Sequence, residues 1–192
     1  MSLLSLDARW RRFNDPDFRS PIDGRAFSGL YDLGFDAPDA WPHGPRPADQ
    51  PLLEAGADRL SAELCRIGEA RYLRAVIALP LRGTGEILYL APWVQVAPAD
   101  FYAWIESTGQ DGATPHDRGP EAIEGLLANA LPGFPEDEGT ALRLMPAGAE
   151  RPRATALAGP LSEAITDGIS FDDLLDLYAA AGDDIRPHIS AG

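Results

Sequence analysis

The sequence reads Tyr72-Leu-Arg-Ala-Val-Ile-Ala-Leu-Pro-Leu81 and then, after the turn residues Arg82-Gly-Thr-Gly85, Glu86-Ile-Leu-Tyr-Leu-Ala-Pro-Trp-Val-Gln-Val96. Both segments contain many of the β-branched and aromatic residues that favour strands. A shorter segment of the same kind, Leu64–Ile67, precedes them across a turn at Gly68-Glu69. Connections this short force neighbouring strands to run antiparallel. The stretch therefore predicts a three-stranded antiparallel meander over residues 64–96.

Two helices have clear start and stop signals. Pro98-Ala-Asp100 places proline at the first helical position and an acid in the first turn, and Gly109 can end that helix. Ser170-Phe-Asp-Asp173 is close to a capping box, and apolar residues follow it at helical spacing until Gly182. Both segments predict amphipathic helices that cover the meander.

The later part of the chain adds shorter elements. Residues 141–145 and 153–157 predict two short strands around a turn, and residues 160–165 predict one or two helical turns. The pattern at 125–131 fits a helix or a strand equally well. The order of these elements lacks the regular alternation of a doubly wound fold. It predicts an α+β fold, in which helices pack on one face of an antiparallel sheet.

The domain organisation follows from length and composition. A chain of 192 residues fits a single α+β domain over residues 20–192, preceded by an N-terminal extension over residues 1–19. Leu3, Leu6 and Trp10 in that extension have helical spacing, which predicts a short helix. The helix could dock on its own domain or on a second copy, so a homodimer formed through residues 1–20 is one prediction.

Charge and residue usage exclude several classes of function. The net charge is −14, and all 16 positive residues are arginine. So acidic a surface repels nucleic acids and anionic membranes, but it permits a basic partner. Without lysine there is no P-loop or lysine Schiff base. The single cysteine and the absence of an apolar leader predict a cytoplasmic protein, and no cofactor or metal site is expected.

The best constellation of functional side chains lies beside a proline-rich loop over residues 42–51. It consists of Asp36, Asp39, Trp41 and His43, and Trp93 is a further candidate for contact with a ligand. Asp36, Asp39 and His43 could surround a divalent cation or perform acid/base chemistry. The structural alternative is that the acids form turns while the two tryptophans cover the core.

Several of these segments resemble a bacterial family known as domain of unknown function 2199. The similarity extends over roughly residues 20–182 and brings no activity with it. The matching segments are Gly34-Phe-Asp-Ala-Pro-Asp39, Ala62-Glu-Leu-Cys65, Tyr72-Leu-Arg-Ala-Val-Ile-Ala-Leu-Pro80, Trp93-Val94, Leu131-Pro-Gly-Phe-Pro135 and Gly168-Ile-Ser170.

The resemblance also implies two departures. Many members of that family have Cys-x-x-Cys-Gly where this chain has Ser20-Pro-Ile-Asp23-Gly24, and His-Pro-Leu where it has Gly159-Pro160-Leu161. Serine and aspartate cannot replace two zinc-binding thiolates, so residues 20–24 are expected to build a turn.

Two hypotheses about function follow. The first is a non-enzymatic binding or regulatory protein whose acidic surface holds a protein or small ligand, for example a basic partner. The alternative is a hydrolase or other acid/base enzyme that uses Asp36, Asp39 and His43. Other acidic and reactive residues are expected to be structural, with Cys65 buried and Glu136-Asp-Glu138 in a solvated loop.

Overall fold

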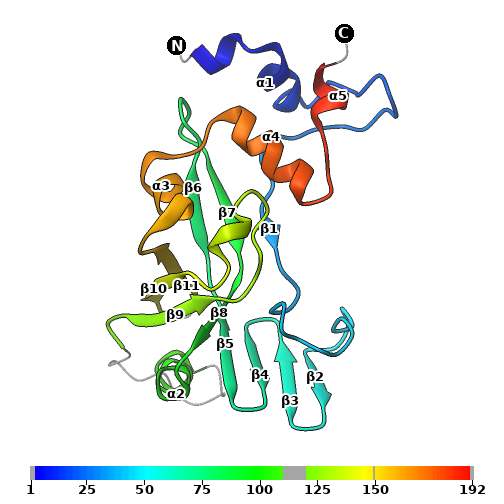
Figure 1. Ribbon diagram of the computed structural model, residues 1–192. Helices are drawn as coiled ribbons and strands as arrows, with labels where there is room; N and C mark the ends of the chain where they lie inside the picture. The colour runs from blue at the N-terminus through cyan, green and yellow to red at the C-terminus, as the bar shows by residue number, and fades with distance from the viewer. Residues whose placement is uncertain (1–2, 110–119, 149, 191–192) are drawn as a thin grey trace.

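The hairpin predicted between residues 72 and 96 lies at the centre of the structure (Figure 1). The computed structural model describes residues 3–109, 120–148 and 150–190. Its helices and its mainly antiparallel strands confirm the α+β class and the antiparallel sheet that the sequence predicts. The composition of residues 107–120, rich in Gly, Thr, Asp and Pro, predicts a second loop, of which residues 110–119 lie outside the described residues.

Each long strand of the hairpin is divided in two. The four resulting strands are β5 (Ala70–Arg74), β6 (Ile77–Pro80), β7 (Ile87–Ala91) and β8 (Trp93–Val96). At the division the Ala75 N–H donates to the carbonyl of Pro92 at 2.9 Å, and the pairing resumes with Ile77 opposite Leu90. Pro92 has no N–H to donate to an adjacent strand. The two halves of the hairpin therefore belong to different sheets.

The larger sheet has eight antiparallel strands in the order β11-β10-β9-β8-β5-β4-β3-β2, and the smaller has the order β1-β7-β6 with β1 parallel to β7. The ambiguous segment at 125–131 contributes to strand β9. The remaining strands are β1 (Leu33–Gly34), β2 (Leu52–Ala55), β3 (Asp58–Ser61), β4 (Leu64–Ile67), β9 (Ile123–Leu127), β10 (Ala141–Ala147) and β11 (Glu150–Ala156).

A short parallel β-bridge brings the last strand of the larger sheet back against the hairpin. Val76 donates its N–H to the carbonyl of Pro152 at 2.9 Å and accepts from the N–H of Ala154 at 2.8 Å, which places β11 beside β6. The hairpin residues Leu73, Ile77 and Leu90 are part of the main core. A second cluster, formed by Leu60, Cys65, Tyr72 and Trp93, lies apart from it.

The helices of the two chain ends lie together at the top of Figure 1, whereas the helix that follows β8 lies at the bottom. Helix α2 (Pro98–Thr108) packs on β5 and ends at Gly109, as predicted. Helix α3 (Gly159–Asp167) packs on β6 and β11, and α4 (Phe171–Ala180) begins with the expected capping box between Ser170 and Asp173. Among the described residues, no helix is long and apolar enough to cross a bilayer.

The N-terminal segment packs on the C-terminal helices. A 3-10 helix (Leu3–Leu6) and α1 (Ala8–Phe13) come first, and α1 contacts α5 (Arg186–Ser190). Phe13 is fully buried, with its ring centroid 5.9 Å from that of Phe171 on α4. Exchange of this segment between two copies stays a prediction.

Residues 20–24 build the turn expected of them. Ser20 donates its N–H to the carbonyl of Arg25 at 2.9 Å, and Gly24 adopts a φ of 76°. The Ser20 hydroxyl also lies 3.0 Å from Nδ1 of His188 on α5. The turn therefore helps to fasten the N-terminal segment to the C-terminal helix.

A polar network completes this attachment. The Arg25 guanidinium donates to both oxygens of Asp183, at 2.5 and 2.6 Å, and the Tyr31 hydroxyl donates to Asp183 at 2.7 Å. These two donors, the Arg25 bond first, lower the pKa of Asp183 to about 2. The Tyr31 and Tyr178 rings stack with their centroids 4.1 Å apart, so the network joins residues 25–31 to α4.

Replacing Phe13 tests how firmly α1 belongs to the core. We expect Phe13→Ala to lower the free energy of unfolding by about 3–5 kcal/mol, because it leaves a cavity beside Phe171. The exposed Arg11 on the same helix provides the control, and Arg11→Ala should change that free energy by less than about 0.5 kcal/mol. Urea unfolding measures both values, and equal effects would contradict the packing.

The Asp183 network predicts a pH dependence of stability. A carboxyl whose pKa is depressed by folding contributes stability above its ordinary pKa, and this contribution is lost as pH falls toward the folded value. At neutral pH, Asp183→Asn should therefore have a free energy of unfolding about 1 kcal/mol lower than that of the unchanged protein. The loss is this small because solvent screens the partly exposed pair of Arg25 and Asp183. The difference should shrink between pH 4 and pH 2. A difference that stays constant over this range would contradict the assignment.

Candidate functional site

Asp39, one of the predicted site residues, fastens its loop to the chain that follows β9. One carboxylate oxygen accepts from the side-chain amide of Asn129 at 2.7 Å, and the other accepts from the N–H of Ala130 at 2.7 Å. The Asp39 N–H in turn donates to the carbonyl of Ala128 at 3.0 Å. Both carboxylate oxygens are therefore engaged within the chain.

Asn129 is the buried centre of this attachment, although the sequence indicates no role for it. Its side chain is fully buried, and its side-chain oxygen accepts from the backbone N–H of Trp93 at 2.8 Å. Its amide also donates to the carbonyl of Ala37 at 3.0 Å. Asn129 thus provides hydrogen-bond partners both for the first residue of β8 and for the loop that contains Ala37 and Asp39.

The two tryptophans of the predicted site have different environments. Trp93 is fully buried, and its indole N–H donates to the carbonyl of Phe35 at 2.9 Å. Trp41 is half-buried, packs on the second hydrophobic cluster, and donates to the carbonyl of Gly44 at 3.1 Å. Trp93 therefore offers no exposed surface, while Trp41 covers the edge of that cluster.

His43 pairs with a residue that the sequence does not single out. Its Nε2 lies 2.9 Å from a carboxylate oxygen of Asp58, and its ring meets Trp41 edge-on with centroids 4.8 Å apart. A bond from the Gly68 N–H and the contact with His43 lower the pKa of Asp58. The exposed Asp36 is joined to neither of them by any bond that the structure describes.

These contacts separate the residues of the acid/base hypothesis, because Asp39 and His43 each have their own structural partner. Within residues 3–109, 120–148 and 150–190, no group of three or more His, Cys, Asp or Glu side chains could hold a metal ion. Cys65 is buried, as expected, and burial raises the pKa of its thiol to about 12. That thiol is protonated at neutral pH and is therefore a poor nucleophile.

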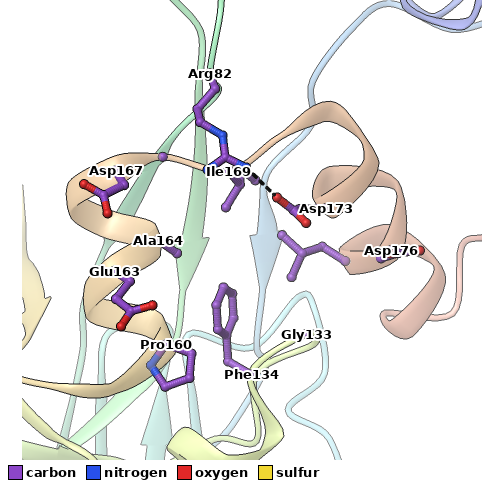
Figure 2. Close-up of a pocket in the computed structure, with 12 residues that line it drawn as sticks. Arg82, Gly133, Phe134, Pro160, Glu163, Ala164, Asp167, Ile169, Asp173 and Asp176 are labelled. Carbon is purple, nitrogen blue, oxygen red and sulfur yellow. Dashed lines mark hydrogen bonds and ion pairs between the residues drawn. The ribbon is translucent and has the colours of Figure 1, made fainter.

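A cleft of about 380 Å³ lies between α3 and α4 (Figure 2). Four α3 residues, Pro160, Glu163, Ala164 and Asp167, line one wall because they share one face of that helix. The opposite wall comes from α4. Phe134 stands between the two helices, and Arg82 enters from the end of β6.

Three close approaches fix the shape of the cleft. Asp137 is buried and accepts from the Leu161 N–H at 3.0 Å, so it caps α3 from another part of the chain. The prediction of a solvated loop at 136–138 is therefore wrong for Asp137. Gly168 lies close to Pro80, because a Cβ atom at Gly168 would come within 2.6 Å of the Pro80 carbonyl oxygen. In the same way, a Cβ atom at Gly133 would come within 2.5 Å of the Leu177 side chain.

The cleft is acidic. Of its described lining residues, four are carboxylates and one, Arg82, is a cation. Asp173 holds the Ser170 N–H at 2.7 Å and pairs with Arg82 at 3.2 Å, while Asp176 pairs with Arg186 at 2.6 Å.

The two acids on α3 differ from those on α4. Within the described part of the chain, the carboxylates of Glu163 and Asp167 have no hydrogen bond or ion pair, and both residues are exposed. The lining of the cleft therefore includes two carboxylates without a described partner, together with the ring of Phe134.

A family description, "Uncharacterized protein conserved in bacteria (DUF2199)", matches residues 23–169 of the 192-residue chain. The chain belongs to the DUF2199 family. This confirms the resemblance, over a somewhat shorter range than the one expected. Ser20 lies outside the matched range, so the replacement of a Cys-x-x-Cys motif stays a prediction. No curated protein and no solved structure matches the chain.

The DUF2199 match includes one side of the cleft. Arg82, Phe134 and helix α3 fall within it, whereas α4 follows its last residue. Two segments that carry the resemblance, Leu131–Pro135 and Gly168–Ser170, both contribute residues to the cleft. In the sequence its carboxylates are only ordinary acids on two helices, so the cleft is apparent only once the helices are placed.

Removing the Asn129 side chain tests whether the loop of Asp39 is fixed structurally. We expect Asn129→Ala to lower the free energy of unfolding by about 1–3 kcal/mol, since it leaves the buried Trp93 N–H without an acceptor. Asp36→Asn in the same loop is the control, with an expected change below about 0.5 kcal/mol. Urea unfolding followed by tryptophan fluorescence measures both, and a larger loss for Asp36→Asn would count against this account.

Proposed function

We propose that this DUF2199 protein is a non-enzymatic binding protein, and that the cleft between α3 and α4 recognises an arginine or lysine side chain of a basic partner protein. The observation that carries the proposal is the pair Glu163 and Asp167. Both lie one helical turn apart on the cleft wall, and neither has a partner among the described residues.

The cleft suits such a side chain along its whole length. The aliphatic stem of lysine or arginine can lie against Ala164, Pro160 and Leu177, which line the cleft. A cation is attracted both to carboxylates and to the face of an aromatic ring such as Phe134. A guanidinium can also bind a carboxylate through two hydrogen bonds, which favours arginine.

The charge of the whole chain supports the same partner chemistry. A net charge of −14 speeds the encounter with a basic protein and disfavours nucleic acid. A cytoplasmic location belongs to this proposal and is supported by the use of a single, buried cysteine. The role would be to hold or regulate the partner rather than to modify it.

Binding of a labelled peptide tests the proposal. We expect a short peptide of alternating arginine and glycine to bind at low salt, as measured by fluorescence anisotropy, and its glutamate counterpart not to bind. The double variant Glu163→Gln/Asp167→Asn should weaken binding about tenfold or more, since it removes two charge-assisted contacts.

A control of equal charge separates the cleft from the general acidity of the surface. Glu69→Gln/Asp49→Asn removes two exposed acids from a hairpin turn and a loop far from α3 (Figure 1). This variant should keep nearly the full affinity. Equal losses in the two double variants, or no binding of the arginine peptide by the unchanged protein, would refute the proposal.

A further inference from the structure

The hairpin strands β6 and β7 are apolar on both faces. Ile77, Leu79 and Leu90 are fully buried on the inner face. The alternate positions, which face away from the main core, include Val76, Ala78, Ile87 and Tyr89. An antiparallel sheet with one solvated face normally has polar residues at such positions. The outer face of this hairpin is therefore built to be covered.

Helix α3 covers only part of that face. Between α3, β6 and β11 there is a cavity of about 480 Å³, a volume typical of small-molecule sites. Its apolar lining comes from Val76, Ala78, Ala154 and Ile165. Ile165 lies on a different face of α3 from the residues that line the acidic cleft, so the two spaces are distinct.

Two arginines of β11, Arg151 and Arg153, line this cavity and differ in whether their guanidinium groups have a partner. Arg151 donates to both oxygens of Glu63, at 2.6 and 2.7 Å, and this pairing raises the pKa of Arg151. Arg153, the next outward residue of the strand, is exposed, and its guanidinium has no hydrogen bond or ion pair within the described residues. The Arg151 guanidinium is thus paired, whereas that of Arg153 has no described partner, and Glu150 contributes a carboxylate to the same lining.

We propose that this cavity binds a small amphipathic carboxylate. The apolar body of the ligand would lie against Val76, Ala78 and Ile165, and its carboxylate would accept two hydrogen bonds from Arg153. Tyr89 lines the same cavity, and its hydroxyl would be a further donor to the carboxylate. The site is separate from the acidic cleft and does not depend on the function proposed for that cleft.

The charge of the protein makes the test discriminating. Decanoate and decylamine have the same chain but opposite charges. Adsorption to a surface of net charge −14 favours the amine, whereas Arg153 favours the carboxylate. Isothermal titration calorimetry below the micellar concentration is carried out with the Glu163→Gln/Asp167→Asn variant, so that the acidic cleft does not bind the amine. It should give specific binding of decanoate and weaker or undetectable binding of decylamine.

Two variants test the two halves of the site. Arg153→Gln should weaken decanoate binding about tenfold or more, because a charge-assisted pair is lost. The matched control is Arg11→Gln, since Arg11 is an exposed arginine on α1, and it should leave the affinity unchanged. Ala78→Phe should abolish binding by filling the cavity, and thermal unfolding must show that each variant is folded.

The result that overturns the proposal is equally definite. It would be decylamine binding as tightly as decanoate to the Glu163→Gln/Asp167→Asn variant, or equal losses for Arg153→Gln and Arg11→Gln. The other occupant of an apolar surface is a second copy of the chain. Light scattering that finds a dimer which decanoate does not dissociate, and which Ala78→Phe does, would also reject the ligand site.

Discussion

Pro92 has no N–H to donate to an adjacent strand, and the central hairpin changes its neighbours at that residue. On one side of this residue, β5 and β8 belong to the eight-stranded sheet. On the other side, β6 and β7 belong to the smaller sheet together with β1. The bridge between Val76 and Arg153 then returns β11 to the same hairpin. One divided hairpin therefore encloses the core, supports α3 and places Arg82 at the cleft.

The position of α3 depends on contacts that are remote in the sequence. Asp137 caps its first turn, and the chain after it is held against Pro80 through the close approach of Gly168. The capping box at Ser170 then starts α4 at once. These hydrogen bonds and this close approach therefore determine where the two walls of the cleft lie.

The elements that the sequence predicts are those whose signals are local. The hairpin, α2 and α4 have their turn residues, caps and apolar spacing within a few positions. The division at Pro92 and the strands β2 and β3 escape prediction, because pairing partners decide them. The same holds for the site. Asp36, Asp39 and His43 attract notice because they are close in sequence, yet Asn129 and Asp58 determine where two of them lie.

Helix α3 is nine residues long and separates two spaces of opposite character. Glu163 and Asp167 face the acidic cleft, and Ile165 faces the apolar cavity beside β11. A single short helix is thus the common partition between them. A tilt of α3 that widens the acidic cleft narrows the apolar cavity, and the reverse also holds. A ligand bound on one side of α3 would therefore change the space available to a ligand on the other side.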